Sequence, residues 1–519
     1  MKHSLKFTII SAIAFGTFSC TNLDEELKSS YTKSFAPANQ GVGIKNNVNK
    51  PLPNDGLQGA FGKLTSGTAT NGGFFQVQEL SSDEAVIAQK GGDWFDGGVY
   101  IAIHQHAFSP TTASINGAWG DAYSGIFQCN ELLGKSPTVS QTAQLRTLRA
   151  YYYWRLLDLF GRVKIVTATG VDAPQSTRLQ LYNFVETELL AVLPNLPAGK
   201  QEYGRVSKGA ANALLCRIYL NAAIYTGDAN GQNGTPQWQK AIDKADDVIN
   251  SGTYSLSTTY KAIFAPDNVE NSEHIFVVPF DEATGTGMNI AQMTLHYPSQ
   301  LTYLLAEQPW NGYAAMEDFY KSYDDPNDSR KLNNFIVGPQ VDVSGNPILD
   351  LAFDKADEDG PAINYTPKIN QLFPNASRQS GARLGKFSFK LGQFSNMDND
   401  YPLLRYSEVL LNKAEAIARK NNNNFSDPTV LSLVNPIRLR AGASAFTSMT
   451  EGQMLAERGR ELFIEGLRRP DLIRFGAWGN AWWEKAGHAA FDYRVVMAIP
   501  IEQIQAASIA NPLTQNSGY

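Results

Sequence analysis

The 519-residue sequence has few cysteines and no excess of basic residues. Its three cysteines, Cys20, Cys129 and Cys216, are too few and odd in number to form a disulfide framework. Cys129 and Cys216 fall in apolar helical stretches, so we predict that both are buried thiols. Lys and Arg number 44 against 50 Asp and Glu, which gives a net charge of −6. This balance argues against a nucleic-acid-binding protein, because such proteins carry a basic surface.

Familiar catalytic motifs are also missing. The sequence contains no Gly-x-Ser-x-Gly, His-Glu-x-x-His, Walker A or Gly-x-Gly-x-x-Gly motif. It has six histidines, and we interpret the one close pair, His104 and His106, as polar surface residues because two imidazoles make a poor metal site. Asp354, Asp357 and Asp359 resemble part of a calcium loop that lacks its glutamate. We predict no enzyme, no catalytic residue, no metal site and no cofactor, with calcium as the alternative.

Long apolar runs are absent except near the N-terminus. Residues 7–18 are almost wholly apolar and follow Lys2 and Lys6, and Ser19-Cys20 comes next. The run is shorter than the roughly 18 residues that span a bilayer, so it predicts a cleaved signal. The small residue before the cysteine resembles a bacterial lipoprotein signal, although Thr17 departs from that pattern. We predict a lipoprotein signal peptide over 1–19, lipidation of Cys20 and a tether over 20–50. An ordinary signal peptide with an incidental cysteine is the alternative.

Helical periodicity dominates the rest of the chain. Apolar residues recur at three- and four-residue steps between Leu145 and Leu159, after a capping-box pattern at Thr138 and Gln141. Similar patterns predict further helices over 207–225, 238–249, 403–420, 428–441 and 451–465, and short strands over 163–166, 275–280 and 494–499. The helices at 207–225 and 238–249 carry small residues and an aromatic anchor, as tetratricopeptide hairpins do. Between about 279 and 402 the chain is rich in Gly, Pro, Asn and Asp, which is typical of loops.

Short segments spread along the chain carry a resemblance to a known family. They are SSDE (81–84), RAYY (149–152), LFGRV (159–163), RVSKGAA (205–211), RYSEVLL (405–411), KAEA (413–416), RLRAG (438–442), ER (457–458), REL (460–462), EG (465–466), DLIR (471–474), IP (499–500) and QNSGY (515–519). In this order they resemble the SusD/RagB family of outer-membrane glycan-binding lipoproteins. Pro436 departs from the pattern of a regular helix and should kink it.

The resemblance implies a mainly α fold. It predicts a single SusD-like domain over 51–519, with a tetratricopeptide-like helical scaffold at about 51–278 and 403–519, few short strands, and a loop-rich insertion at about 279–402 that holds the ligand. In this fold Arg405, Arg458, Arg460, Glu461 and Asp471 are predicted to form buried or interfacial ion pairs.

The resemblance also implies a function. It predicts a non-catalytic, lipid-anchored protein of the outer membrane that faces the cell surface, captures oligosaccharide and delivers it to a SusC-like TonB-dependent transporter. Asp24-Glu25-Glu26 resembles the acidic signal that sends such lipoproteins to the surface. Peptide cargo, a lipid-anchored glycoside hydrolase and a pure protein scaffold are the alternatives.

Two loops carry candidate ligand residues. Sugar rings have apolar faces and hydroxyl rims, so their sites combine aromatic side chains with polar groups. Trp94 lies between glycine pairs in the segment 90–98, next to Asp93 and Asp96, and exposing a tryptophan there is costly unless it is used. The segment 296–313 adds Tyr297, Trp310, Asn311 and Tyr313. We predict a glycan site from these residues and Asp83, with packing as the alternative for Trp94 and turn formation for Asn311. We expect Trp482 and Trp483 to pack on the scaffold.

Overall fold

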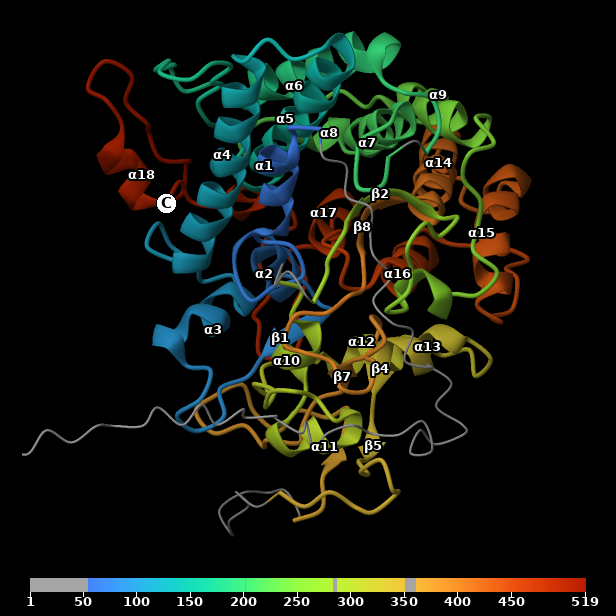
Figure 1. Cartoon of the computed structure of the whole chain (residues 1–519). Helices are drawn as coiled ribbons and strands as arrows, with labels where there is room; N and C mark the ends of the chain where they lie inside the picture. Colours follow the sequence, from blue (N-terminus) through green and yellow to red (C-terminus); the bar gives the residue numbers. More distant parts are fainter. Residues whose placement is uncertain (1–54, 201, 283–286, 351–360) are drawn as a thin grey trace, which may run out of the picture. The chain divides into compact units, whose positions relative to one another are not determined.

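The computed structural model describes residues 55–519 except residue 201 and the segments 283–286 and 351–360 (Figure 1). The predicted signal peptide, Cys20 and the tether over 20–50 lie outside the described residues, as do Asp354, Asp357 and Asp359 of the suggested calcium loop. All described residues belong to one compact unit.

Helices make up most of the regular structure, which confirms the predicted mainly α fold. The α-helices are α1 (Gln58–Phe61), α2 (Gly73–Leu80), α3 (Val99–His104), α4 (Ala113–Leu133), α5 (Val139–Leu159), α6 (Arg178–Val192), α7 (Lys208–Leu220), α8 (Ala222–Tyr225), α9 (Trp238–Ile249), α10 (Ile290–Thr294), α11 (Gln300–Tyr303), α12 (Glu317–Lys321), α13 (Ser329–Asn334), α14 (Tyr406–Lys420), α15 (Pro428–Arg440), α16 (Glu451–Leu462), α17 (Arg468–Arg474) and α18 (Ile501–Ala506). Within the described residues, no helix is both long enough and apolar enough to span a membrane.

The long helices form a scaffold of packed pairs. Helix α4 packs on α5, α5 on α6, α7 on α9, and α9 on α14, which also contacts α15. These helices gather in the upper part of Figure 1. Ala211 of α7 and Ala241 and Ala245 of α9 are fully buried, and their small side chains let the two helices approach closely. This arrangement is the predicted tetratricopeptide-like scaffold.

Local sequence signals set several helix boundaries. Thr138 and Gln141 form a complete capping box at the start of α5, and Thr450 and Gln453 do the same for α16. Ser207, the first residue of the helix predicted over 207–225, caps α7, but that helix ends at Leu220 instead of continuing to Tyr225. Helix α14 begins at Tyr406 because the residues before it form a strand. Pro436 lies inside α15, which continues through it to Arg440.

The strands are short and pair only in twos. They are β1 (Ala85–Ile87), β2 (His274–Val278), β3 (Tyr313–Ala315), β4 (Phe335–Ile336), β5 (Gly338–Pro339), β6 (Asn364–Tyr365), β7 (Arg383–Leu384) and β8 (Tyr401–Arg405). The antiparallel pairs are β1–β3, β2–β8, β4–β7 and β5–β6. The strand predictions for 163–166 and 494–499 were wrong: Lys164 forms only an isolated bridge with Gln175, and Tyr493–Val495 is a 3-10 helix.

Two of these strand pairs fix the loop-rich segment to the scaffold. The β2–β8 pair joins the beginning of this segment to its end. The β1–β3 pair joins residues 313–315, inside the segment, to the strand that follows α2. Between β2 and β8, the described helices α10 to α13 have four to six residues each. This segment appears in yellow and orange in the lower part of Figure 1. Its loops are therefore held by pairing with strands from distant parts of the chain.

A network of buried charges stabilises the scaffold. We call Arg330, Arg405, Arg440, Glu273, Glu457 and Glu461 the buried arginine cluster. Glu461 is its centre: its Oε1 lies 2.7 Å from Arg405 Nη1 and 2.5 Å from Arg440 Nη2, and its Oε2 lies 3.0 Å from Arg330 Nη1. Burial alone would raise the pKa of Glu461, but the three arginines hold it well below its ordinary value.

The same pattern extends to Arg458, Arg460 and Asp471. Arg458 pairs with Asp471 at 2.7 Å, and Arg460 pairs with Glu457 at 2.9 Å. The prediction that Arg405, Arg458, Arg460, Glu461 and Asp471 form buried ion pairs is confirmed. Cys129 and Cys216 are also buried and free, as predicted.

Candidate functional site

Three predicted aromatic residues, Trp94, Tyr297 and Trp310, meet at an open cavity of about 460 Å³, which we call the aromatic site. The site joins the loop after β1 to the loop between α11 and β3, so it lies where the scaffold meets the loop-rich segment. Its lining residues are Asn71, Asp93, Trp94, Asp96, Tyr297, Gln308, Pro309 and Trp310. The structure thus brings together five of the predicted ligand residues.

Trp94 is held in place by backbone geometry and by one hydrogen bond. Lys90 and Asp93 exchange backbone hydrogen bonds of 3.0 and 3.1 Å, which close a tight turn just before it. Trp94 itself has φ 61°, a conformation that a bulky residue rarely adopts and that is common at functional sites. Its indole Nε1 donates to the carbonyl oxygen of Trp310 at 2.5 Å. The half-buried ring is therefore fixed at the edge of the cavity.

The ring of Trp94 also rests on the glycine backbone at 312. A Cβ atom added to Gly312 would lie 2.5 Å from the Trp94 ring, which is too close for any real contact. The ring of Tyr100, on α3, also packs against the ring of Trp94, and the two ring centroids lie 5.5 Å apart. A glycine is needed at 312 because the indole occupies the space of a side chain.

Trp310 and Tyr297 provide the other aromatic surfaces. Trp310 is 39% exposed, and its backbone N–H donates to the carbonyl oxygen of Gln292 at 2.6 Å. Tyr297 is half-buried, and its hydroxyl donates to the carboxylate of Asp93. Burial and this carboxylate together raise the pKa of Tyr297, so the hydroxyl keeps its proton as a donor to Asp93.

Two exposed carboxylates lie at the rim, and each is oriented by a tyrosine. Asp93 accepts from Tyr297, and Asp96 Oδ2 accepts from the Tyr100 hydroxyl at 2.6 Å. Burial, followed by the hydrogen bond to Asp96, raises the pKa of Tyr100 to about 12. An ionised carboxylate has about four acceptor positions, so each aspartate keeps free lone pairs after binding its tyrosine. Hydroxyl groups of a ligand can donate to these positions.

The structure removes three predicted residues from the site. Tyr313 is 0% exposed because β3 pairs with β1 and turns its ring toward Phe75 in the core. Asn311 is also fully buried, and its Nδ2 donates to His296 Nδ1 at 3.0 Å and to the Arg378 carbonyl at 3.1 Å. Asp83 forms a two-point ion pair with Arg468, at 2.6 and 2.8 Å, away from the lining. The burial of Tyr313 and Asn311 argues against direct contact with a ligand, and the role of Asp83, which is partly exposed but does not line the cavity, stays a prediction.

Other residues join the site without having been predicted. Gln308 and Pro309 adjoin Trp310, and their loop context alone could have indicated them. Asn71 precedes α2 and reaches the site only through the fold; its Nδ2 lies 3.5 Å from the Tyr100 hydroxyl. Nothing in the local sequence around Asn71 indicates this position.

The histidine pair was assigned to the wrong environment. His104 and His106 are buried, not on the surface. The ring of His106 stacks on Trp478 with centroids 3.9 Å apart, and its Nε2 lies 2.9 Å from the Ser81 carbonyl. Burial lowers the pKa of His104 to about 4. Trp482 and Trp483 pack around His104, as expected for scaffold residues.

Across the described part of the chain, no group of three or more His, Cys, Asp or Glu residues could hold a metal ion.

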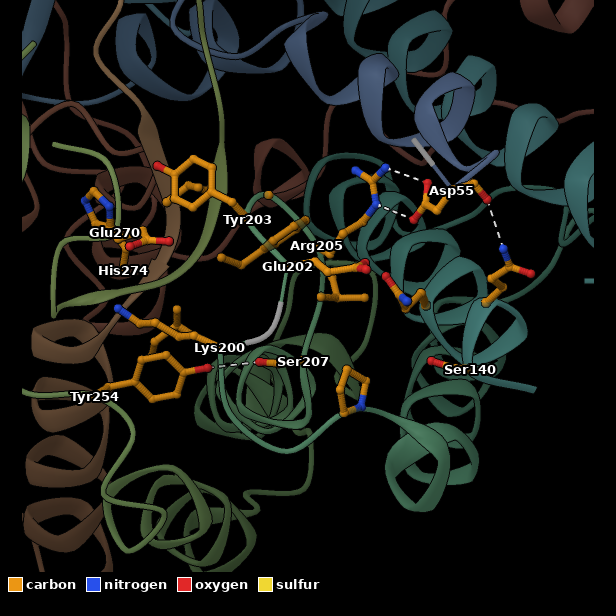
Figure 2. A pocket seen from close by; sticks show the side chains of 18 of the residues that line it. Asp55, Ser140, Lys200, Glu202, Tyr203, Arg205, Ser207, Tyr254, Glu270 and His274 are labelled. Carbon is orange, nitrogen blue, oxygen red and sulfur yellow. Dashed lines mark hydrogen bonds and ion pairs between the residues drawn. The ribbon is translucent and has the colours of Figure 1, made fainter. Parts of the chain in front are cut away.

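A second cavity, of about 480 Å³, lies between the start of α5, the loop before α7 and strand β2 (Figure 2). Several of its polar side chains bind one another, and others bind residues outside the lining. Arg205 forms a two-point ion pair with Asp55, at 2.8 and 3.0 Å, and the Ser207 and Tyr254 hydroxyls lie 2.9 Å apart. No tryptophan lines it. We therefore take the aromatic site, where two tryptophans meet exposed acceptors, as the candidate functional site.

Comparisons with known proteins cover both halves of the aromatic site. The model of the SusD family matches residues 272–510, and a model described as starch-binding associating with outer membrane matches residues 76–220. The chain belongs to the SusD family. The two matched segments of this SusD-family protein contain Trp310 and Trp94 respectively.

Individual relatives agree with this assignment. Starch-binding protein SusD of Bacteroides thetaiotaomicron is 25% identical over 572 aligned positions, which cover 100% of this chain and 99% of the relative. A SusD-like protein of Bacteroides ovatus is 24% identical and covers 69% of this chain and 65% of its own.

Solved structures confirm the SusD-like fold. A laminarin-binding SusD-like protein superposes with a TM-score of 0.69 at 23% identity, covering 89% of this chain and 98% of the other. Surface glycan-binding protein A from Bacteroides thetaiotaomicron, in complex with laminarihexaose, gives a TM-score of 0.68 at 22% identity with the same coverage. At these identities the likeness shows the fold of this SusD-family protein.

Proposed function

We propose that this protein is a non-catalytic, lipid-anchored glycan receptor of the outer membrane. It captures oligosaccharide at the aromatic site on the cell surface and delivers it to a SusC-like TonB-dependent transporter. One observation carries the proposal: Trp94 and Trp310 are joined by a hydrogen bond at an open cavity whose rim carries Asp93 and Asp96.

The chemistry of the aromatic site suits a sugar. The C–H faces of a pyranose ring pack on indole and phenol rings, while its hydroxyl groups donate to carboxylates and amides. Trp94, Trp310 and Tyr297 supply the rings, and Asp93 and Asp96 supply acceptors. Sugars keep many of their hydrogen bonds to water at an open site, so we expect modest affinity.

The anchor and the partner are supported by the sequence and by the family. The predicted signal over 1–19 followed by Cys20 supports a lipid anchor, and one matched family model is described as associating with the outer membrane. Delivery to a transporter follows from the resemblance to SusD/RagB lipoproteins, with the helical scaffold as the docking surface.

Native affinity electrophoresis of the lipid-free protein in gels that contain laminarin, starch or other polysaccharides tests the receptor role. We expect at least one polysaccharide to retard the protein and Trp310→Ala to abolish the retardation. Phe127→Ala is the control, because Phe127 is an exposed aromatic residue on α4 outside the site, at 54% exposure against 39% for Trp310. Retardation that Trp310→Ala leaves unchanged would contradict the site. Release of reducing sugar ends by the purified protein would contradict the non-catalytic role.

A further inference from the structure

All the charged side chains in the lining of the aromatic site are negative. Its eight residues include the carboxylates of Asp93 and Asp96 but no lysine, arginine or histidine. Both aspartates are exposed, and each is hydrogen-bonded to a neutral tyrosine hydroxyl, which leaves its negative charge uncompensated within the lining. The whole chain is also acidic, with a net charge of −6.

Two cations close to the site, Lys90 and Arg378, are not part of the lining of the cavity. Lys90 is 4% exposed, and its Nζ lies 3.3 Å from both the Ala88 and the Gly312 carbonyl oxygens, below the Trp94 loop. Arg378 is half-buried and close to Tyr297, but it does not line the cavity. A negative group on a ligand would therefore meet two carboxylates before it met a positive side chain.

The carboxylates of the site favour a ligand that donates, whereas the amides of Asn71 and Gln308 can both donate and accept and so do not discriminate. The Tyr297 hydroxyl donates to Asp93 and the Tyr100 hydroxyl donates to Asp96. The indole N–H of Trp94 donates to the Trp310 carbonyl oxygen, so none of these three groups is available to a ligand as a donor. The carboxylates keep free lone pairs and can only accept. A sugar hydroxyl can donate to them, whereas a ligand carboxylate or sulfate has no proton to give and is repelled.

We propose that the aromatic site selects uncharged glycans and rejects glycans that carry uronate or sulfate groups, with Asp93 and Asp96 as the residues that determine this specificity. The inference rests on the proposed glycan-binding function and adds the chemical class of the ligand. The tyrosines act as positioning residues, because they hold the two carboxylates at the rim.

Matched pairs of polysaccharides test the selectivity. Isothermal titration calorimetry would compare laminarin with sulfated laminarin, and soluble starch with sulfated starch, at about 10 mM and about 150 mM salt, where the Debye length falls from about 30 to about 8 Å. We expect a neutral form to bind at least about tenfold more tightly than its sulfated form at low salt. The difference should shrink as salt screens the repulsion, with little change for the neutral form.

The double variant Asp93→Asn/Asp96→Asn assigns the effect to the site. Asparagine keeps the shape and an acceptor oxygen for each tyrosine but removes the charge, so we expect the preference for the neutral form to fall at least about threefold. Asp243→Asn/Asp318→Asn is the control, because it removes two exposed carboxylates from α9 and α12 outside the lining. We expect the control to keep the preference of the original protein.

The outcomes separate this inference from the proposed function. Sulfated polysaccharide that binds as tightly as the neutral form at low salt, and loses binding in Trp310→Ala, would overturn the selectivity and leave the receptor role intact. A preference that both double variants reduce equally would also overturn it, because net charge would then be the cause. If neither neutral nor sulfated polysaccharide binds, the receptor role falls and the selectivity falls with it.

Discussion

The buried arginine cluster and the aromatic site use carboxylates in opposite ways. In the cluster, Glu461 is fully buried and contacts three arginines, so its charge is balanced by the protein itself. At the aromatic site, Asp93 and Asp96 are exposed and each binds a neutral tyrosine. A carboxylate paired with cations serves the fold, whereas one oriented by a hydroxyl keeps both its charge and its lone pairs for a ligand.

Breaking the cluster should give the largest effect. Glu461→Gln removes the one negative charge that Arg330, Arg405 and Arg440 share. Each arginine keeps another carboxylate, but the buried cluster loses part of the negative charge that balances its cations. We expect a loss of about 3–5 kcal/mol in the free energy of unfolding, measured by urea denaturation. Glu317→Gln is the control, because Glu317 pairs with Lys321 at the surface and should change stability by less than about 1 kcal/mol. A loss for Glu461→Gln no larger than that of the control would refute the structural role of the cluster.

A third carboxylate environment, buried but without a contacting arginine, sharpens the comparison. Glu79 accepts from the Gly466 backbone N–H at 2.7 Å, and nearby Glu84 accepts from Ile464 N–H at 3.0 Å. Burial raises the pKa of Glu79 to about 7, and burial and Glu79 raise that of Glu84 well above its ordinary value. The folded state therefore binds protons that the unfolded state releases, and this contribution to stability is lost as pH rises from about 4.5 to about 7.

Glu79→Gln tests this dependence on pH. In the original protein, Glu79 should lower the free energy of unfolding by up to about 1.4 kcal/mol per pH unit as pH rises through this window. The amide of the variant is neutral at every pH, so this part of the decrease should be absent. Urea denaturation of both proteins at several values between pH 5 and 7.5 measures the difference. If the two stability curves run parallel across this window, the protonation of Glu79 is disproved.

The smallest effect should come from the packing of Trp94 on Gly312. Gly312→Ala places a methyl group in the space of the indole, so Trp94 must move away from the Trp310 carbonyl. We expect the polysaccharide that retards the original protein to bind about tenfold more weakly. The thermal midpoint should change little, because the atoms that meet the new methyl group belong to the half-buried ring of Trp94. Gly92→Ala is the control, since a Cβ there meets nothing within 4 Å. Equal affinities for the two variants would show that the position of Trp94 does not matter.

Local chemistry predicted much of the scaffold and only part of the site. Capping boxes at Thr138 and Thr450 need only four consecutive residues, so the sequence reveals them. The glycines around Trp94 likewise indicated a ring with no helix or strand face to bury it. The burial of Tyr313, in contrast, depends on the pairing of β3 with β1, which lies far away in the chain. The surroundings of His106 depend in the same way on Trp478, and those of Asn71 on Tyr100.

The hydrogen bond between Trp94 and Trp310 has a consequence for how long a ligand stays. It joins two loops that are distant in sequence, so the aromatic surfaces are in place before a glycan arrives. Little ordering is then needed on binding, and no closing segment has to open again for the ligand to leave. We expect such a site to exchange its ligand quickly, and a short residence time would suit the proposed delivery of glycan to a transporter.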